Sequence, residues 1–456
     1  MTLRSTTTAV AVACTFVAAS AAQQAPQQTQ APLERGNVLL VVADDVGCDM
    51  IASFGAHPAA VPTPNIDAFA ATGVSFVSAY TDPVCSPSRA CMLTGRYGFR
   101  TYLGDAIQEF QPEYSLSQWE LTVPEVLALK SPRPVTNAAI GKWHLGSISN
   151  GGPIHPNLEG FGYFRGTLGN FFFGQTYSNY TKITNGVAST STTYASTDQV
   201  NDALTRIPLM REPWFMYMGF NGAHKPFHAP PANLHTYALS GSPDATPHEH
   251  YRAAVQAMDT EFGRLLASIN PEVLARTTVI FIGDNGSPND VVLAPSIPGQ
   301  SKGTLYEGGV HVPLIVSGPA VNYPGSRCYA PVNSVDLFPT MLARFNVTVS
   351  KGFLDGRPFD GVDLTPYLAQ PWRAPLREWV FSTKFVPNGV GPYAASGFMI
   401  RDARWKLIER AGQTEQFFDM ASPQGEQANL LTAPLTPAQS SAYDFLKSKM
   451  KKLIES

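Results

Sequence analysis

Charge and cysteine are both scarce in this chain of 456 residues. Charged residues make up only 15%, and 32 lysines and arginines nearly balance 35 aspartates and glutamates, for a formal net charge of −3. A nucleic-acid-binding protein usually carries a basic excess, so we expect no such partner. The five cysteines are too few for a disulfide-dense scaffold. Beyond residue 22 no apolar run is long enough to span a bilayer, so no transmembrane segment is expected.

Apolar residues, by contrast, are plentiful. Hydrophobic residues make up 44% of the chain and aromatic residues 11%, which is enough for a large packed core and excludes global disorder. At roughly 150 residues per domain, the length predicts two or three domains. The 37 glycines and 38 prolines, together with the low charge, favour a loop-rich secreted enzyme.

The N-terminus is typical of an export signal. Arg4 precedes an apolar stretch of small residues over 9–22, which contains an Ala-Ser-Ala cleavage pattern. This stretch is too short to span a bilayer. We therefore expect a cleaved signal peptide over residues 1–22, a disordered Gln/Pro-rich linker over residues 23–35, and a secreted or periplasmic mature protein.

Four cysteines remain once the signal peptide and its Cys14 are removed. In an exported protein, four cysteines would normally indicate two disulfides. One of them, Cys85, has a more specific interpretation below. We expect Cys48 and Cys91 to be structural, and Cys328 to stay free or to pair with one of them.

Four apolar runs end in residues that can ionise or bind a metal. The runs and the residues that follow them are 37–43 before Asp44-Asp45, 137–141 before Lys142-Trp143-His144, 214–220 before Asn221-Gly222-Ala223-His224, and 278–283 before Asp284-Asn285. Such continuous runs are typical of strands buried on both faces of a parallel sheet. Because ligands bind at the carboxyl ends of strands in open α/β sheets, we expect these side chains to converge.

Helical patterns alternate with these runs, at residues 63–72 and 249–270, and predict a large α/β catalytic domain over residues 36–375. After that point the pattern changes to short antiparallel strands with tight turns. The expected elements are strands at 378–382, 397–401, 405–408 and 416–419, followed by an amphipathic helix at 442–454. They predict a smaller C-terminal α+β subdomain over residues 376–456.

Residues 85–96, CSPSRACMLTGR, form the most specific segment. The proline suits the first turn of a helix, Ser86 or Ser88 could cap it, and the glycine could end it. Cys85 would then lie at a helix N-terminus, where backbone N–H groups favour an anion. Arg89, one turn later, offers a planar fork for a tetrahedral oxyanion. The segment predicts a nucleophile inside an anion-binding site.

This segment resembles the signature of the type I sulfatases, the formylglycine-dependent members of the alkaline-phosphatase-like superfamily. Further blocks are similar to that family in the expected order, at 37–45, 141–146, 223–230, 283–286, 301–309, and 415–420 with 428–431. The resemblance covers nearly the whole mature chain. It implies an α/β fold of the alkaline-phosphatase-like type, with a large mixed or parallel sheet sandwiched by helices and a smaller C-terminal subdomain of antiparallel sheet plus helix.

The resemblance also implies a cofactor chemistry. A maturation enzyme would oxidise Cys85 to formylglycine, an aldehyde present as a geminal diol. One hydroxyl would attack sulfur, and deprotonation of the other would release sulfate. Asp44, Asp45, Asp284 and Asn285, with the oxygen on residue 85, would bind one Ca²⁺ or Mg²⁺, because hard cations prefer oxygen ligands.

The same resemblance assigns roles to the basic residues. Arg89, Lys142 and Lys302 would offset the charge of the transferring group. His144 would deprotonate the second hydroxyl, and His224, with Lys302, would protonate the leaving alcohol.

Several of these residues also admit simpler interpretations. Asp44 and Asp45 could form a strand-terminal turn or a helix cap, and Asn285 begins a glycosylation sequon. His228 is a rival for the role of His224. Taken together, order and spacing favour the catalytic interpretation.

We therefore expect a sulfuric ester hydrolase that acts on carbohydrate or aryl sulfates, with the sulfated compound and the maturation enzyme as its partners. The alternatives are a phosphonate monoester or phosphodiester hydrolase of the same superfamily, and an inactive glycan-binding member in which Cys85 stays a thiol. Selectivity is expected from the loops at 97–120 and 151–194. The aromatic residues of the second loop could stack on a substrate ring or could simply pack the loop.

Overall fold

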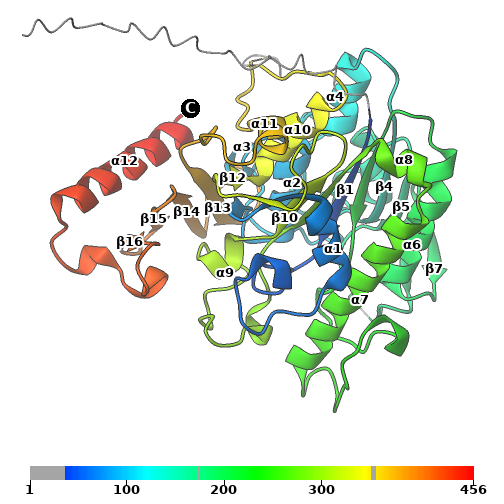
Figure 1. Ribbon diagram of the computed structural model, residues 1–456, viewed down its shortest axis with the longest axis horizontal. Coiled ribbons are helices and arrows are strands. Elements are labelled where there is room, and N and C mark those ends of the chain that lie inside the picture. The colour runs from blue at the N-terminus through cyan, green and yellow to red at the C-terminus, as the bar shows by residue number, and fades with distance from the viewer. Residues whose placement is uncertain (1–35, 173, 351–355) are drawn as a thin grey trace, which may run out of the picture. The chain divides into compact units, whose positions relative to one another are not determined.

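A ten-stranded mixed sheet carries the candidate site. The protein is represented by a computed structural model that describes residues 36–172, 174–350 and 356–456 (Figure 1). The sheet has the order β11-β2-β10-β9-β1-β8-β4-β5-β6-β7. Its strands are β1 (Asn37–Ala43), β2 (Gly73–Phe76), β4 (Thr136–Lys142), β5 (Phe164–Thr167), β6 (Tyr180–Thr184), β7 (Val187–Ser191), β8 (Trp214–Gly219), β9 (Thr277–Gly283), β10 (Leu314–Ser317) and β11 (Ser326–Cys328).

The four apolar runs form neighbouring strands, as the sequence predicts. Strands β9, β1, β8 and β4 lie side by side and are all parallel. Ala43 at the end of β1 is in register with Gly283 at the end of β9, and Gly141 of β4 is in register with Gly219 of β8. The polar residues that follow these strands therefore all lie at the edge of the sheet formed by the carboxyl ends of the strands.

Helices cover both faces of this sheet. The helices of the described residues are α1 (Pro64–Thr72), α2 (Cys85–Thr94), α3 (Gly98–Thr101), α4 (Val123–Lys130), α5 (His155–Leu158), α6 (Ala195–Arg206), α7 (Pro247–Ser268), α8 (Pro271–Ala275), α9 (Glu307–Val310), α10 (Leu337–Ala343), α11 (Thr365–Ala369) and α12 (Pro437–Ile454), the last of which packs on the small C-terminal sheet instead. Leu40 of β1 belongs to one hydrophobic cluster with residues of α2, α4 and α10, whereas its neighbour Leu39 belongs to a second with residues of α1, α6 and α7. This alternation follows from the two-residue period of a strand and confirms the predicted sandwich.

A separate four-stranded antiparallel sheet follows near the C-terminus, as predicted. It comprises β13 (Val380–Val386), β14 (Ala395–Arg401), β15 (Trp405–Arg410) and β16 (Gln416–Asp419), in that order. Helix α12 packs against β14 and β15 (Figure 1). It begins five residues earlier than the pattern of apolar residues indicates, because Thr436, just before the helix, forms a capping box with Gln439 in its first turn.

The small sheet holds the segment that leads into α2. A short two-stranded sheet pairs β3 (Ala79–Tyr80) with β12 (Val332–Asn333) just before it. The Ser382 hydroxyl donates to the carbonyl of Thr81 at 2.6 Å, and the Thr383 N–H donates to Asp82 Oδ1 at 2.7 Å. From within α2, the Cys91 thiol donates to Asp82 Oδ2 at 3.3 Å. The Asp82 carboxylate thus joins β13 of the small sheet to α2, and its burial raises its pKa to about 7.

Other sequence predictions fall outside what the structure tests. Both sheets belong to one compact unit, so the domain boundary near residue 375 stays a prediction. The predicted signal peptide and linker lie outside the described residues. Within the ranges that are described, no helix has the length and apolar character needed to cross a membrane.

Candidate active site

Three aspartates meet at the carboxyl ends of β1 and β9. The pairing of Ala43 with Gly283 places Asp44 and Asp284 next to each other, and the Asp284 N–H donates to the Ala43 carbonyl at 3.0 Å. The Asp45 N–H in turn donates to Asp284 Oδ1 at 3.0 Å. All three aspartates are at most 1% exposed. Three buried carboxylates this close together require positive charge nearby.

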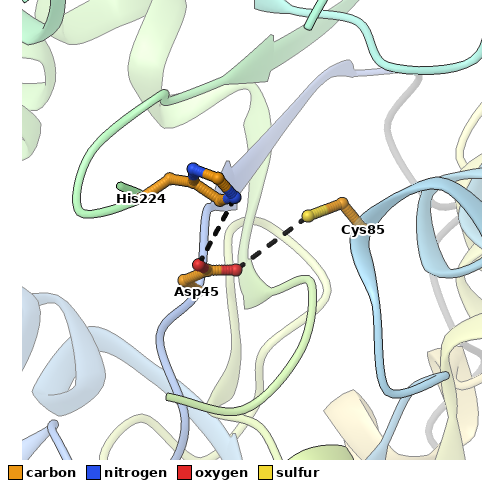
Figure 2. Close-up of side chains that lie close together, drawn as sticks. All are labelled: Asp45, Cys85 and His224. Carbon is orange, nitrogen blue, oxygen red and sulfur yellow. Dashed lines mark hydrogen bonds and ion pairs between the residues drawn. The ribbon is translucent and has the colours of Figure 1, made fainter. Parts of the chain in front are cut away.

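Cys85 is the first residue of α2 and faces these aspartates. Its Sγ lies 3.3 Å from Asp44 Oδ1. The same sulfur lies 3.9 Å from Asp45 Oδ1, as Figure 2 shows. The predicted helix N-terminus is confirmed, but the predicted cap is wrong. Val84 is the N-cap residue, while the hydroxyl of Ser88 turns back to the Val84 carbonyl at 3.0 Å.

Ser86, the other predicted cap, uses its hydroxyl to bind a neighbouring loop instead. Its hydroxyl accepts the N–H of Ile107 at 3.0 Å and so ties the loop after α3 to the start of α2. At the far end of α2, Gly95 adopts a φ of 68° and ends the helix as predicted.

Arg89 links Asp284 to the ends of β4 and β8. Its Nε and Nη2 lie 3.0 and 2.8 Å from Asp284 Oδ2. Its Nη1 donates to the Lys142 carbonyl at 3.0 Å and to the Tyr217 hydroxyl at 2.6 Å. Sequence reasoning missed Tyr217, because its hydroxyl is hidden inside an apolar run. The guanidinium is fully buried and fixed on three sides.

Two lysines hold the other aspartates. Lys142 Nζ lies 2.6 Å from Asp44 Oδ2 and 3.5 Å from Cys85 Sγ. Lys302 Nζ lies 2.5 Å from Asp45 Oδ1. With Arg89 on Asp284, each aspartate has its own basic partner.

Burial and these partners shift the pKa values in different directions. Burial raises the pKa of Asp44 to about 7, against the opposing effect of Lys142. Burial also works to raise the pKa of Asp45 and of Asp284, but the neighbouring positive charges together outweigh it and lower both values. Lys302 contributes most at Asp45, and Arg89 contributes most at Asp284. Burial raises the pKa of the Cys85 thiol, which therefore stays protonated.

His224 points at Asp45 from the segment that follows β8. Its Nε2 lies 3.7 Å from Asp45 Oδ2 (Figure 2), and its Nδ1 lies 2.6 Å from the Lys225 carbonyl. Burial and the charge of Lys302 lower its pKa to about 3. The rival His228 instead stacks on Tyr177 with 3.6 Å between ring centroids. The geometry therefore favours His224 as the member of the site.

His144 is buried at the end of β4. Its Nε2 lies 2.9 Å from the Ile107 carbonyl and 3.9 Å from Glu109 Oε2, and its Nδ1 is buried without a hydrogen-bond partner among the described residues. Burial and the charges of Lys142 and Arg89 lower its pKa. No hydrogen bond joins it to Cys85 within the described part of the chain. Both His144 and Asp45 have positive φ values, 59° and 61°, a strained conformation that is concentrated at functional sites.

The donor set fits a hard cation. One possible ligand atom each from Asp44, Asp45, Cys85 and Asp284 lies within 4.8 Å of the others. Asn285 Nδ2 donates to Asp45 Oδ1 at 2.8 Å, while its Oδ1 is buried and has no hydrogen-bond partner among the residues described. An unpaired buried amide oxygen beside three carboxylates suits Ca²⁺ or Mg²⁺. Because Asn285 is 0% exposed, the folded chain leaves no room for a glycan at its sequon.

The four cysteines within the described ranges are free thiols. Cys48, Cys85, Cys91 and Cys328 are all buried and unpaired in the structure, so the disulfide that the sequence left open for Cys328 does not form.

The aromatic residues of the second selectivity loop, over residues 151–194, are mostly packed inside the protein. Those that are buried are Phe161, Phe164, Phe171, Tyr177 and Tyr180.

Comparisons with known proteins agree with this geometry. The chain matches the Sulfatase family model over residues 36–347. Arylsulfatase A from Bos taurus is 28% identical over 430 residues, which cover 88% of this chain and 80% of the relative. N-acetylgalactosamine-6-sulfatase from Rattus norvegicus is 29% identical over 371 residues, which cover 73% of this chain and 66% of the relative.

A solved structure of similar fold is described as "Ps i-CgsB in complex with k-i-k-neocarrahexaose". It matches 92% of this chain and 93% of its own with a TM-score of 0.76 at 24% identity. This likeness confirms the fold expected from the sequence.

Proposed function

The chain belongs to the sulfatase family and is a hydrolase of sulfate esters, and from that premise we propose that it hydrolyses carbohydrate or aryl sulfate monoesters to the alcohol and inorganic sulfate. The observation that carries the proposal is the position of Cys85. It lies at a helix N-terminus, 3.3 Å from Asp44 and 3.5 Å from Lys142 Nζ. Both a nucleophile and an anion fit this position.

Two groups that the family implies would complete the site. Cys85 would be converted by a maturation enzyme to formylglycine, whose hydrated form supplies a hydroxyl nucleophile and an internal route for sulfate release. A Ca²⁺ or Mg²⁺ bound by Asp44, Asp45, Asp284 and Asn285 would lower the pKa of that hydroxyl and polarise the sulfate. The unpaired Asn285 Oδ1 and the clustered carboxylates support this assignment.

The basic side chains supply the remaining functions. Arg89 is fixed by Asp284 and Tyr217, so its guanidinium is already oriented before substrate binds. Lys142 would donate to the transferring sulfate. His144, whose pKa is lowered and whose Nδ1 has no partner among the described residues, would accept a proton, and His224, with Lys302, would protonate the leaving oxygen.

The relatives bear on the substrate class. One is named for aryl sulfates and another for a sulfated amino sugar, so we propose that the leaving group here is an aryl or sugar alcohol. The intact set of basic residues does not favour the phosphonate monoester or phosphodiester alternative. Export through the predicted signal peptide belongs to the same proposal.

The charge of the site gives the test of the proposed function. Three carboxylates, one divalent cation, Arg89 and two lysines leave roughly two positive charges, which a singly charged sulfate ester and an ionised nucleophile would neutralise. A phosphate monoester carries nearly two negative charges, so with the ionised nucleophile it would leave the site with a net negative charge. We expect aryl sulfate to show a higher kcat/KM than the matched aryl phosphate monoester in steady-state assays of matured enzyme.

Inorganic phosphate should inhibit the same reaction competitively, because it can occupy the sulfate subsite without a leaving group. A phosphonate monoester or phosphodiester hydrolysed faster than every sulfate ester would contradict the proposal. A Cys85 that stays a thiol after co-expression with the maturation enzyme, together with no hydrolysis of any of these esters, would favour the inactive, glycan-binding alternative.

The role of Lys302 can be tested through the leaving group. In Lys302→Ala, kcat/KM should fall roughly a hundredfold more for sulfates of alkyl alcohols than for activated aryl sulfates, since only poor leaving groups need a proton. The measurement is kcat/KM across a series of esters of graded leaving-group pKa. Lys447→Ala, which removes a lysine of α12 paired with Glu409 of β15, is the matched control and should not change how kcat/KM depends on the leaving-group pKa. An equal loss for all esters would show that Lys302 acts only on the sulfate.

A further inference from the structure

A pocket of about 540 Å³ lies beside His224. Lys225 and Phe227, which line it, directly follow His224, and Asp290 comes from the short 3₁₀ helix η5 (Asn289–Val291) after β9. Phe171, Phe172 and Asp244 also line the pocket. The pocket is therefore built by segments that leave the same sheet edge as the candidate active site.

The walls of the pocket share supports with that site. The Phe171 ring packs on Tyr177 with centroids 4.7 Å apart, and the Tyr177 hydroxyl donates to the His224 carbonyl at 2.6 Å. Phe227 packs on Tyr251 at 6.0 Å, and the Tyr251 hydroxyl donates to the Asp45 carbonyl at 2.6 Å. Two residues of the pocket wall, Phe171 and Phe227, therefore pack on the same tyrosines that hold the backbone of His224 and Asp45.

The pocket offers apolar surface and an excess of negative charge. Phe227 is half-buried and Phe172 is 39% exposed, so both present ring surface to a ligand. Lys225 forms an ion pair with Asp290, whereas Asp244 makes no ion pair with any of the residues described. The one lysine and two aspartates leave the wall with a net negative charge, unlike the positive sulfate subsite.

We propose that this pocket binds the ring of the leaving alcohol and selects rings without a second anionic group over rings that carry a carboxylate or further sulfate. The proposal rests on the proposed function, because it assigns the leaving group of that reaction. Apolar ring faces would pack against Phe227 and Phe172, and hydroxyl groups would bond to the Asp244 and Asp290 carboxylates. An added anion would instead face these carboxylates and be repelled.

A matched pair of aryl sulfates tests this selection. The sulfate ester of methyl para-hydroxybenzoate and that of para-hydroxybenzoate have the same ring, but only the second carries a carboxylate. The ratio of their kcat/KM values, compared between wild type and variant, cancels their different intrinsic reactivity. Asp290→Asn should shift this ratio towards the carboxylate ester by roughly three- to tenfold, since it removes a negative charge and frees Lys225.

Lys225→Met should shift the ratio in the opposite direction. The charge-matched control is Asp444→Asn, an exposed aspartate on α12 outside the pocket, which should leave the ratio unchanged. Phe227→Ala should raise KM for both esters and leave inhibition by inorganic phosphate, which needs only the sulfate subsite, unaltered.

The outcomes separate the two proposals. Hydrolysis of both esters with a ratio that neither Asp290→Asn nor Lys225→Met shifts would overturn the pocket assignment and leave the proposed function standing. If matured wild-type enzyme hydrolysed neither ester nor any other sulfate ester, the proposed function itself would fall.

Discussion

Replacing Cys85 with alanine is expected to lower kcat for every sulfate ester by at least roughly 10⁴-fold. The thiol is the precursor of the proposed nucleophile, and no other side chain of the site can form a covalent intermediate with an internal exit. The substitution removes only a sulfur that is 3.3 Å from Asp44. The protein should therefore fold as before, which the melting temperature and circular dichroism would show.

Cys328→Ala is the matched control, since Cys328 is also a buried free thiol but lies in β11 at the edge of the sheet. It should retain wild-type kcat. Peptide mass spectrometry of active wild-type enzyme should show the Cys85 thiol replaced by an aldehyde. Full activity in Cys85→Ala, or an unmodified thiol in fully active enzyme, would refute the proposed mechanism.

Removing the cation is expected to abolish activity and lower the melting temperature together. Asp44, Asp45 and Asp284 come together as ligands only in the folded chain, so the cation would bind the folded state and stabilise it over the unfolded state. Chelation should destabilise the fold, and addition of Ca²⁺ or Mg²⁺ should restore both activity and melting temperature. Metal analysis of purified active enzyme should give one ion per chain.

Asp284→Ala should lower activity and melting temperature in the same way, but added Ca²⁺ or Mg²⁺ should not restore them. It removes a metal ligand and also breaks the closer of the two ion pairs of the buried Arg89, which keeps only Asp44 at 3.6 Å. Breaking a buried ion pair costs about 3–5 kcal/mol of unfolding free energy. Asp419→Asn breaks the exposed pair with Arg404 and should change stability by less than about 1 kcal/mol. Purified active enzyme that holds zinc, or no metal, would disprove the assignment.

The strands and the place of the site could be predicted because both depend on local pattern. Continuous apolar runs such as 37–43 fit only a buried strand, and parallel neighbours place Asp44 and Asp284 together without further information. The α2 N-terminus was also predictable, since Pro87 and Gly95 mark its two ends. Local propensity and tertiary packing agree at these positions.

The details that could not be predicted depend on distant contacts. Ser86 and Ser88 are both good caps, but packing against Ile107 and the Val84 carbonyl uses their hydroxyls. Tyr217 looks like a core residue in sequence, and only the approach of Arg89 gives its hydroxyl a function. Nothing in the sequence around His144 indicates that the Ile107 carbonyl is its partner. Such contacts are set by how loops cross the sheet edge, which no periodic pattern encodes.

The contacts of Asp82 limit where the chain can be truncated or joined to part of a relative. The family model ends at residue 347, and every proposed catalytic and metal-binding residue lies before that point. A fragment ending there would keep all of these residues and still lose Ser382 and Thr383, which anchor the lead-in to α2. A chimaera with a relative therefore needs to exchange the small sheet together with α2, because the hydrogen bonds of Ser382 and Thr383 hold the start of that helix.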